Sequence, residues 1–587
     1  MATNLVYRFL AANDFRLLHV SPGEGVQQIH ARLSHATVSD DQRLTYETIS
    51  YAWGDPTPVA EALVNGLPVL IPANTEEVLK RVRLHDRERI IWIDAVCINQ
   101  IDLHERSAQI VLMGSIYAGS LRNLVFLGEL DENMAIRVLG LIEAINQDAR
   151  LETNDFESLD ATLSDNVVSE KRSMTRFAFE VDLEAELSLL ELPLLRRLWV
   201  LQELVLAPQS VALLGSIELE LSDVLLAIRW IKYKQWNLPL PSVALAGRNC
   251  GQFLFDFVDR VHGYYAGSRI GLDHLMQCGR IFEKTEPRDG VYAVLGLLPQ
   301  DQVFDLRPDY TKPLAEVLVS ATRSAIDNSQ NLELFREIAH REDDLEYGNI
   351  PSWAVRVDRE FNFLVDGEHL PGYHRLPESS RDVQSIEWER ADPMILPVQG
   401  ITVGNVVEVT APLQHNRAQR VSADQLNRFC MSLKACCEAA ARDCSLEVSL
   451  RGLAEVLIAG TSIDGSRADT SAIDAAEELI AYLGEPREPT ESSHALRKAR
   501  VRCEFGSAIN RRMFITEDGK PGLGPRVMRQ GDLVAVLRGA SFPAILRCDP
   551  QGRHQLVGEA YLHGIMDGEA EAMLDAMRGR ETTFELR

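Results

Sequence analysis

The stretch from Arg89 to Arg106 limits the fold of this chain more than any other. It opens with the apolar run Ile90-Ile-Trp-Ile93, which is too short for most helices and rich in β-branched and aromatic side chains. Such a run is typical of a strand that is buried on both faces of a sheet. Asp94 comes next, at the carboxyl end of the expected strand, where open α/β sheets place their ligand-binding groups. A polar turn and the start of a helix complete a unit that could carry a functional site.

The neighbouring segments repeat this alternation of strands and helices. Strands are expected over 5–7, 15–20, 29–33, 46–53, 123–128 and 211–215, with a hairpin over 62–71 that turns at Asn65-Gly66. Helices are expected over 74–85 with Asn74 as cap, over 103–119, over 131–149, and over 194–207 between Pro193 and Pro208. This order predicts an α/β fold, with a parallel sheet at its core and helices on the faces of the sheet.

At 587 residues the chain is too long for one hydrophobic core, so several regions are expected. In chain order they are a β-rich lead-in over 1–44, the α/β domain over 45–216 with an insertion at about 129–190, a mainly helical region over 217–345, a mixed α+β region over 346–483, a linker over 484–499, and a β-rich region over 500–587. Regularly spaced glycines between short apolar runs predict a small antiparallel barrel or sandwich for the last region.

Composition narrows the classes of partner and compartment. The formal net charge of −26 argues against a nucleic-acid or anionic membrane surface as the main partner. No apolar run is long enough to predict a membrane span, and no signal peptide is expected. The nine cysteines form no CxxC pair, which favours buried free thiols over a metal site. We therefore expect a cytoplasmic protein with no metal and no bound cofactor.

Several blocks of residues together resemble one known family. They are Thr48-Ile-Ser-Tyr-Ala-Trp-Gly-Asp55, Trp92-Ile-Asp-Ala-Val-Cys-Ile-Asn-Gln100, Glu105-Arg106, Gln109, Met113, Ile116-Tyr117, Leu127-Gly128, Arg197-Leu-Trp-Val-Leu-Gln-Glu203 and Glu286-Pro-Arg-Asp-Gly-Val-Tyr-Ala-Val-Leu-Gly-Leu297. In order and spacing they resemble the fungal heterokaryon incompatibility (HET) domain. The segment from Gly531 to Glu569 resembles the C-terminal region that often accompanies this domain.

The resemblance implies a fold and a function. HET proteins are associated with fungal non-self recognition and regulated cell death. The domain is also distantly similar to Toll/interleukin-receptor (TIR) domains, which have a flavodoxin-like parallel sheet, and some of which cleave NAD at the nicotinamide bond with a glutamate. Residues 49–51 resemble the first TIR strand and residues 91–94 the second. Trp199 and Glu203 resemble the tryptophan and the catalytic glutamate of the TIR helix.

Glu203 has a functional and a structural interpretation. Residues 199 and 203 project from one helical face, and an unpaired carboxylate on so apolar a helix would be costly to bury. A desolvated glutamate could stabilise the cationic sugar that forms as nicotinamide leaves, or act as nucleophile or base. Alternatively, Glu203 could form an ion pair with Arg196 or Arg197 and hold the helix to the sheet.

The strand ends supply the other candidate residues. Asp94 could hold a ribose hydroxyl or cap the turn that follows it. Tyr51 or Trp53 could stack on an aromatic ring or belong to the core. Asp102 is expected to cap a helix with Glu105 completing a capping box. The candidate site then consists of Glu203 as catalytic residue and Ser50, Tyr51, Trp53, Asp55, Asp94, Asn99 and Trp199 as substrate-binding residues.

Two functional hypotheses remain. In the first, the chain is an effector of cell death that hydrolyses NAD as its substrate, and assembly into a homo-oligomer gates the activity. In the second, it is a non-catalytic signalling module that acts through self-assembly and through a protein partner in non-self recognition. Both use the same domain, and the environment of Glu203 distinguishes them.

Overall fold

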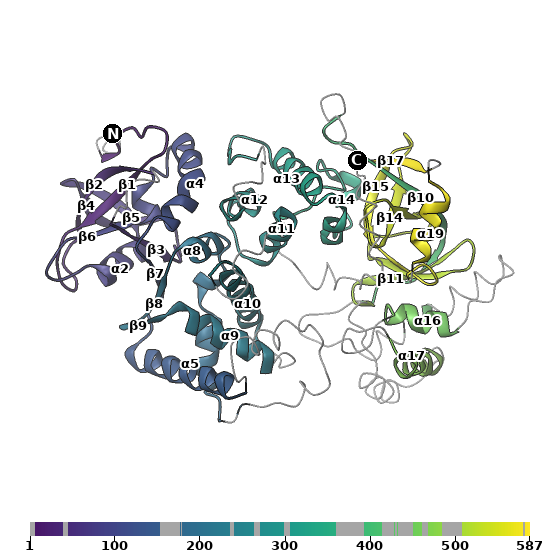
Figure 1. Ribbon diagram of the computed structural model, residues 1–587, viewed down its shortest axis with the longest axis horizontal. Coiled ribbons are helices and arrows are strands. Elements are labelled where there is room, and N and C mark those ends of the chain that lie inside the picture. The colour runs from purple at the N-terminus through teal and green to yellow at the C-terminus, as the bar shows by residue number, and fades with distance from the viewer. Residues whose placement is uncertain are drawn as a thin grey trace. The chain divides into compact units, whose positions relative to one another are not determined.

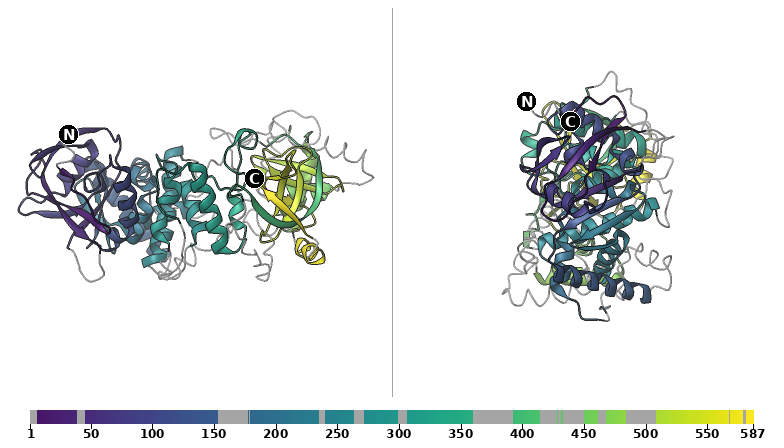
Figure 2. Two further views of the ribbon diagram at one scale, coloured as in Figure 1. Left: turned by 90° about the horizontal axis from the view of Figure 1, so that it is seen from above. Right: turned by 90° about the vertical axis from the view of Figure 1, so that its left-hand side faces the viewer.

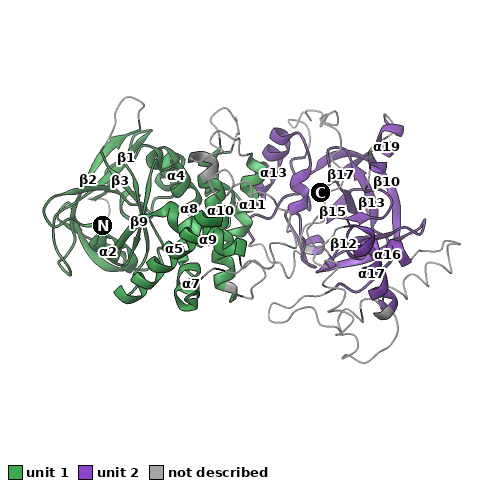
Figure 3. Ribbon diagram, turned by 60° about the horizontal axis from the view of Figure 1, so that its bottom comes forward, with its two compact units in different colours: residues 1–165, 171–313 green, residues 166–170, 314–587 purple. Residues whose placement is uncertain are grey.

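A computed structural model of the 587-residue chain describes residues 6–38, 45–152, 177, 179–234, 240–262, 271–298, 306–359, 392–413, 428, 431–432, 450–460, 468–483, 508–566, 568–578 and 581–587. The described residues form two compact units. Unit 1 ends at Pro313, and unit 2 runs from Leu314 to Arg587 (Figure 3). Among the described residues, no helix combines the length and the apolar character that crossing a membrane requires.

Unit 1 is built on a mixed nine-stranded sheet (Figure 1). Its strands are β1 (Asp14–Val20), β2 (His30–Thr37), β3 (Glu47–Tyr51), β4 (Pro58–Val64), β5 (Leu67–Pro72), β6 (Arg89–Trp92), β7 (Asn123–Gly128), β8 (Ser210–Leu214) and β9 (Ile217–Glu220). They lie in the order β5-β4-β2-β1-β6-β3-β7-β8-β9. The expected lead-in strands β1 and β2 therefore belong to this same sheet. The strand predicted over 5–7 is wrong where it can be seen, because Val6 and Tyr7 belong to no strand.

The centre of the sheet is parallel, as expected from its apolar strands. β3 pairs in parallel with β6 on one side and with β7 on the other, and β7 pairs in parallel with β8. Counted along the chain, these four strands lie in the order second, first, third, fourth, which is the order of flavodoxin-like doubly wound sheets. The antiparallel pairs β1–β2, β1–β6, β4–β5 and β8–β9 extend this centre on both sides. The sheet is therefore mixed rather than parallel throughout.

Helices cover both faces of the parallel centre. Those of unit 1 are α2 (Ala73–Val82), α3 (Asp94–Cys97), α4 (Leu103–Ala118), α5 (Glu132–Glu152), α7 (Leu183–Leu190), η2 (Pro193–Arg196), α8 (Val200–Leu206), α9 (Leu221–Lys234), α10 (Ser242–His262), α11 (Leu272–Ile281), α12 (Asp289–Tyr292) and η3 (Leu295–Leu297). The Tyr51 hydroxyl bonds Thr75 of α2, whereas its neighbour Ser50 bonds Asn123 beneath α8. Because successive strand residues point to opposite faces, α2 and α8 lie on opposite sides of the sheet.

Most of the helices after β7 share one hydrophobic core with β7 and β8. Residues of α5, α7, α8, α9, α10 and α11 are buried together with Val125, Ala212 and Leu214. Within the insertion expected at 129–190, α5 and α7 are therefore parts of the core, while residues 153–176 lie outside the described residues.

The turn after β3 explains why one helix cap was predicted wrongly. Gly54 has a φ of +63°, in the left-handed region that favours glycine, and a Cβ there would lie 2.7 Å from Asn74 Nδ2. The Asn74 amide donates to the carbonyl oxygen of Ala52, 3.0 Å away, and so does not cap α2. That helix begins at Ala73 behind Pro72 without a side-chain cap.

The start of α4 confirms one half of the expected capping box. Asp102 accepts hydrogen bonds from the backbone N–H groups of His104 and Glu105, as a cap residue does. The Glu105 carboxylate does not return to the Asp102 N–H. It instead forms a bidentate pair with the buried Arg16 of β1, at 2.6 and 2.9 Å. The acidic side chain therefore holds the helix to the sheet, and the predicted reciprocal bond is wrong.

Unit 2 closes its strands into a barrel. Its elements are α13 (Leu314–Ser329), η4 (Glu333–Glu337), α14 (Asp344–Tyr347), β10 (Leu396–Val409), α16 (Leu450–Leu457), α17 (Thr470–Leu483), β11 (Arg511–Thr516), β12 (Pro521–Pro525), β13 (Leu533–Leu537), β14 (Pro543–Cys548), β15 (His554–Glu559), β16 (Tyr561–Leu562), α19 (Glu569–Ala576) and β17 (Thr582–Leu586). The sheet order β13-β14-β15-β17-β10 is completed by pairing of β13 with β10, which makes a closed ring (Figure 2).

The long strand β10 makes this closure feasible. Its first part pairs with β17, its middle with β13 and its end with β11, with shifts of register where it bends. Of the barrel or sandwich expected at the end of the chain, the structure shows a barrel, with one strand contributed from residues 396–409 and with β15 and β17 paired in parallel rather than antiparallel. The expected linker over 484–499 lies outside the described residues.

Candidate active site

A buried glutamate of α8 lies on the face of the sheet that carries Ser50 of β3 and Asn123 of β7. Glu203 of α8 is 5% exposed, and its carboxyl group interacts with the hydroxyl groups of Ser50 on β3 and Tyr117 on α4. The pKa of Glu203 is raised from 4.5 to about 7, chiefly by burial and in smaller part by the nearby charge of Asp94. The Arg197 charge and the two hydroxyl groups act in the opposite direction. Removal from water therefore dominates the electrostatics of this carboxyl group.

A break in the predicted helix over 194–207 places Glu203. Residues 193–196 form the short helix η2, Arg197 is extended with a ψ of 136°, and α8 begins only at Val200. The break arises because the backbone of Arg196 and Leu198 pairs with that of Glu283, with hydrogen bonds of 2.7 and 2.9 Å. The prediction of one continuous helix is wrong for this reason. The spacing of Trp199 and Glu203 persists, because the Glu203 N–H still donates to the Trp199 carbonyl oxygen.

The strands beneath Glu203 carry a polar network. Asn123 donates from Nδ2 to the Ser50 hydroxyl oxygen at 2.9 Å, and its amide also lies 3.4 Å from the Glu203 backbone oxygen. Thr48 and Ser120 extend the network on the same face. Buried polar groups are tolerated when they bond to one another, and this network holds Ser50 in a fixed orientation next to the carboxyl group.

The expected ion pair of Glu203 is not formed. Arg196 pairs with Glu283 at 2.8 Å, and Arg197 donates to the backbone oxygen of Tyr51. Among the described residues, no basic group lies within 4.0 Å of the Glu203 carboxylate oxygens. Arg197 is close enough to act on Glu203 and Asp94 through its charge, but it is bonded elsewhere. Glu203 is therefore a buried carboxyl group that has no ion-pair partner among the described residues.

Asp94 and Trp53 form a second polar element near Arg197. The Trp53 indole N–H donates to both carboxylate oxygens of Asp94, at 3.0 and 3.2 Å, and the Ala95 N–H donates to Oδ1 at 2.7 Å. Burial of the carboxyl group raises the pKa of Asp94, which the Arg197 charge partly offsets. Of the two interpretations of Asp94, the bond to Ala95 matches the turn-capping one.

Trp199 faces a different cluster. Its indole N–H donates to Oδ2 of Asp289 at 2.9 Å, and the Tyr310 hydroxyl donates to Oδ1 at 2.6 Å. Asp289 is 5% exposed, and burial raises the pKa of its carboxyl group. The motif that begins at Glu286 therefore contacts the first residue of the helix turn that carries Glu203.

The remaining predicted residues make other contacts. Tyr51 is buried in the core on the α2 side, where its hydroxyl group bonds Thr75 at 2.8 Å. Asp55 is exposed and accepts hydrogen bonds from Thr57 in a turn. The Asn99 N–H donates to Glu105 at the start of α4. The structure thus brings Asp94 and Glu203 close to Arg197, with Ser50 at Glu203 and Trp53 at Asp94, and the Tyr51 hydroxyl group is near enough to interact with all three charges from the α2 side.

Three residues of the site were missed as site residues from the sequence. Tyr117 and Arg197 lie inside the motif blocks, where Arg197 was expected only as a possible ion-pair partner of Glu203 and no local pattern shows that Tyr117 meets Glu203. From the sequence, Asn123 is recognisable only as the first residue of a predicted strand. A polar residue at the start of an otherwise apolar buried strand is the one signal that could have marked it.

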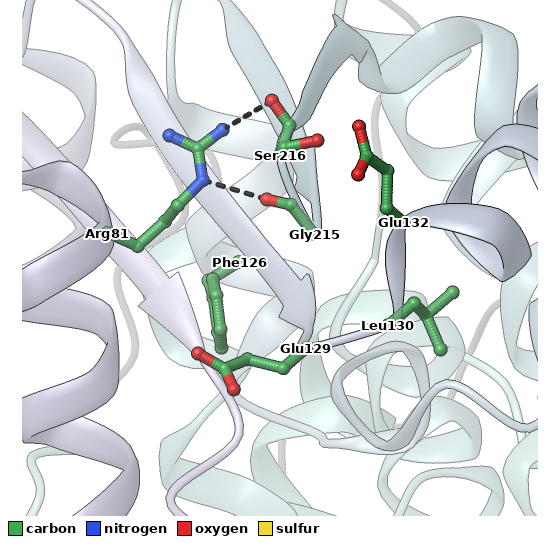
Figure 4. Close-up of a pocket in the computed structure, with 7 residues that line it drawn as sticks. All are labelled: Arg81, Phe126, Glu129, Leu130, Glu132, Gly215 and Ser216. Carbon is green, nitrogen blue, oxygen red and sulfur yellow. Dashed lines mark hydrogen bonds between the residues drawn. The ribbon is translucent and has the colours of Figure 1, made fainter. Parts of the chain in front are cut away.

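A pocket of about 400 Å³ opens on the other face of the sheet (Figure 4). Its lining consists of Arg81, Phe126, Glu129, Leu130, Glu132, Gly215 and Ser216. Phe126 pairs in register with Tyr51 and so faces the α2 side, opposite to Ser50 and Glu203. The Arg81 guanidinium donates to the carbonyl oxygens of Gly215 and Ser216, at 2.8 and 3.3 Å. None of the predicted site residues lines this pocket.

The arrangement around Glu203 suits proton transfer and the stabilisation of a cation. A carboxyl group with a pKa of about 7 is present in both protonation states near neutral pH, so it can take up or release a proton there. In its ionised form it would stabilise a positive charge strongly, because it is shielded from water. Ser50 is 1% exposed, so the group is enclosed in this conformation.

Comparison with known proteins finds one family match in the N-terminal part of the chain and another in the C-terminal part. A family model described as heterokaryon incompatibility protein (HET) matches residues 46–203, and one described as the Het-6 beta-barrel domain matches residues 494–579. The chain is 24% identical to heterokaryon incompatibility protein 6, OR allele, of Neurospora crassa, over 89% of this chain and 90% of that relative. No solved structure matches, so the similarity to TIR domains stays a prediction. These matches agree with the motif blocks of the sequence, and they identify a HET domain over residues 46–203 of the chain.

Proposed function

We propose that this protein is an effector of fungal non-self recognition whose α/β domain hydrolyses NAD at the bond between nicotinamide and ribose. The non-self recognition role rests on the match to the HET family and to the Neurospora relative. The catalytic role rests on one observation, the buried Glu203 carboxyl group that has no ion-pair partner among the described residues. Buried groups with strongly shifted pKa values that are not used in ion pairs are typical of functional sites. The expected likeness of Trp199 and Glu203 to the TIR helix supports the same assignment.

Hydrolysis of NAD at this bond requires one carboxylate beside the ribose. The glycosidic C–N bond breaks, its electron pair goes to the ring nitrogen, and nicotinamide leaves as a neutral molecule. The sugar carbon becomes an oxocarbenium-like cation, which the ionised Glu203 stabilises. A water molecule then adds to this carbon, and Glu203 accepts its proton before releasing it to solvent. The products are nicotinamide, ADP-ribose and one proton.

The neighbours of Glu203 have matching roles in this proposal. Ser50 and Tyr117 direct their hydroxyl groups to the carboxyl group, and the Tyr117 hydroxyl also donates to the Ile49 carbonyl oxygen at 3.2 Å. Asp94, oriented by Trp53, is the candidate for a ribose hydroxyl. Because Glu203 and Ser50 are almost fully enclosed, the substrate requires an opening of this side of the domain. An enclosed site suits an effector that stays inactive until it is triggered, and self-association is the proposed trigger.

The decisive experiment replaces Glu203 by glutamine in the full-length chain. Glu203→Gln preserves shape and removes the charge, so we expect nicotinamide release from NAD to fall about 100-fold or more. The matched control is Glu129→Gln, which removes an exposed carboxylate from the same domain. Nicotinamide release is measured with purified protein, and NAD content and viability are measured in expressing cells. Undiminished release by the folded Glu203→Gln protein would exclude Glu203 as the catalyst.

A second function follows from the enclosure of the same site. If Glu203 never meets substrate, the domain acts as a signalling module through self-assembly and partner binding. The 5% exposure of Glu203 and 1% exposure of Ser50 favour this alternative. It predicts that NAD stays constant in dying cells, and that charge reversals on an assembly surface abolish cell death. The Glu203→Gln protein would then remain fully toxic.

A further inference from the structure

The segment after α11 contacts the residues at the start of α8 at two points. At the first point, the Leu198 N–H donates to the Glu283 carbonyl oxygen at 2.9 Å, and the Glu283 N–H donates to the Arg196 carbonyl oxygen at 2.7 Å. The Arg196 and Glu283 side chains also pair at 2.8 Å. This contact interrupts the helix and leaves α8 with only seven residues. So short a helix cannot fix its own orientation and depends on its contacts.

The second point is the bond between Trp199 and Asp289. Trp199 precedes α8, which has no side-chain cap, and its carbonyl oxygen accepts the Glu203 N–H at 3.3 Å. Asp289 accepts the Trp199 indole N–H at one carboxylate oxygen and the Tyr310 hydroxyl at the other. A buried acceptor whose two oxygens are both engaged holds its donors firmly, because breaking either bond leaves a polar group without a partner.

Tyr310 connects this cluster to the helix that carries Tyr117. The Arg106 guanidinium of α4 lies 4.5 Å from the centre of the Tyr310 ring, and that of Arg288 lies 5.7 Å from it. The Arg106 charge also acts on Asp289, since it lowers the pKa that burial raises. The cluster therefore joins α4, α8 and the segment that starts at Glu286, away from Glu203 itself.

We propose that Asp289 is a positioning residue for Glu203, which it orients by holding Trp199 at the start of α8. The inference rests on the proposed function, in which Glu203 is the catalyst. Asp289 touches neither the Glu203 carboxyl group nor its hydroxyl partners in the structure, so its influence passes through Trp199 and the first turn of α8. Loss of the bond lets this turn shift, and small shifts of a catalytic group are costly.

The test compares two replacements of Asp289 in the full-length chain. Asp289→Leu removes both acceptors, whereas Asp289→Asn keeps an oxygen for Trp199 and offers its amide to the Tyr310 oxygen. We expect kcat to fall about 10- to 100-fold in Asp289→Leu with little change in KM, and to stay near the parent value in Asp289→Asn. Equal activity of the folded Asp289→Leu protein and the parent would overturn the proposal.

A second readout does not depend on turnover. The Glu203 carboxyl is followed by carbon NMR with labelled glutamate, its signal assigned by its absence in Glu203→Gln. The groups that face it are Ser50, Asp94, Tyr117 and Arg197, and all of them remain in the Asp289 variants. We expect the pKa of Glu203 to fall in Asp289→Leu, because water enters as α8 loosens. An unchanged titration would overturn the positioning role even if Glu203 proved not to be catalytic.

A third variant covers the case in which Asp289→Leu does not fold. Trp199→Phe keeps an aromatic ring at the start of α8 and removes only the N–H that Asp289 accepts. We expect the same downward shift in the Glu203 titration, with folding checked by thermal unfolding. If the Trp199→Phe protein titrates like the parent, the bond to Asp289 does not position Glu203.

Discussion

Two buried glutamates, one in each unit, have opposite surroundings. Glu559, the last residue of β15, is 2% exposed and lies between Arg511 at 2.7 Å and Arg336 at 3.1 Å. Glu203 is 5% exposed and has no basic group within 4.0 Å among the described residues. Both carboxyl groups have lost most of their contact with water. Among the described residues, only Glu559 has gained ion-pair partners in place of water.

This difference separates a structural role from a functional one. A buried charge that is paired and hydrogen-bonded has its desolvation largely offset, and removing one partner is expensive. A buried carboxyl group without such a pair lowers stability whenever it ionises, so the fold would gain from its loss. Residues that a fold keeps at a cost to its stability are typical of sites that carry out chemistry. The same substitution, Glu to Gln, should therefore have opposite effects at the two positions.

The largest effect is expected at Glu559. Glu559→Gln takes the negative charge from between two guanidinium groups, and should destabilise unit 2 by about 3–5 kcal/mol. Urea unfolding of the full-length chain, followed by hydrogen exchange in peptides from β13 to β15, measures this unit by itself. A loss of stability below about 1 kcal/mol would mean that the ion pairs of Glu559 contribute no more than surface ion pairs do. The contrast between Glu559 and Glu203 would then be wrong.

The next effect is expected at Glu203, with the opposite sign. The pKa of this carboxyl group is about 7 in the folded chain and near 4.5 when it is unfolded, so the folded state holds the proton more tightly. Below pH 4.5 both states are protonated and the group costs nothing. As the pH rises to 7, Glu203 ionises first in the unfolded state. The free energy of unfolding therefore falls by about 3 kcal/mol.

Glu203→Gln should therefore match the parent chain in acid and exceed it by up to about 3 kcal/mol above pH 7. The measurement is urea unfolding between pH 4 and 8, followed by hydrogen exchange in peptides from β3 and β7. Glu129→Gln serves as the control, because it shows what the loss of one negative charge does by itself. A stability difference that does not change with pH would mean that Glu203 is not held as a neutral group.

The sequence predicts the elements of this comparison far better than their contacts. Apolar runs such as Ile90 to Ile93 mark the central strands, because burial on both faces demands apolar side chains. The Gly-punctuated runs near Glu559 predict a barrel in the same way. Nothing local distinguishes the two glutamates, since each lies in a mostly apolar segment. Their difference depends on arginines that the fold brings from distant parts of the chain.

The environment of α8 shows the same limit. Residues 194–207 are as apolar as one continuous helix would be, and Pro193 is a suitable first residue. The break at Arg197 is made by Glu283, 87 residues after the Arg196 that it pairs with. Helix propensity depends on the local sequence. A pairing with a distant residue can override it, and the sequence around the break does not show this. The family resemblance predicts Glu203 as the catalytic residue, but only the structure shows that this residue has no ion-pair partner among the described residues.

The smallest effect is expected at Arg197, and it tests whether Glu203 is truly without a pair. Arg197 donates to the Tyr51 carbonyl oxygen and acts on Glu203 through its charge alone. Arg197→Leu should therefore cost about 1 kcal/mol, the contribution of one hydrogen bond. It should also raise the pKa of Glu203, because a positive charge that favours ionisation is gone. Stability at pH 6 and the carbon NMR titration measure the two effects.

A cost of about 3–5 kcal/mol in Arg197→Leu would instead mean that Arg197 and Glu203 form a buried ion pair in solution. Glu203 and Glu559 would then belong to one class, and Glu203 would stabilise the contact of α8 with the sheet. The small cost is expected because the Arg197 guanidinium is directed to the end of β3, where a backbone oxygen already accepts its proton. With that bond made, the carboxyl group of Glu203 stays free of an ion pair with Arg197, as the proposed function requires.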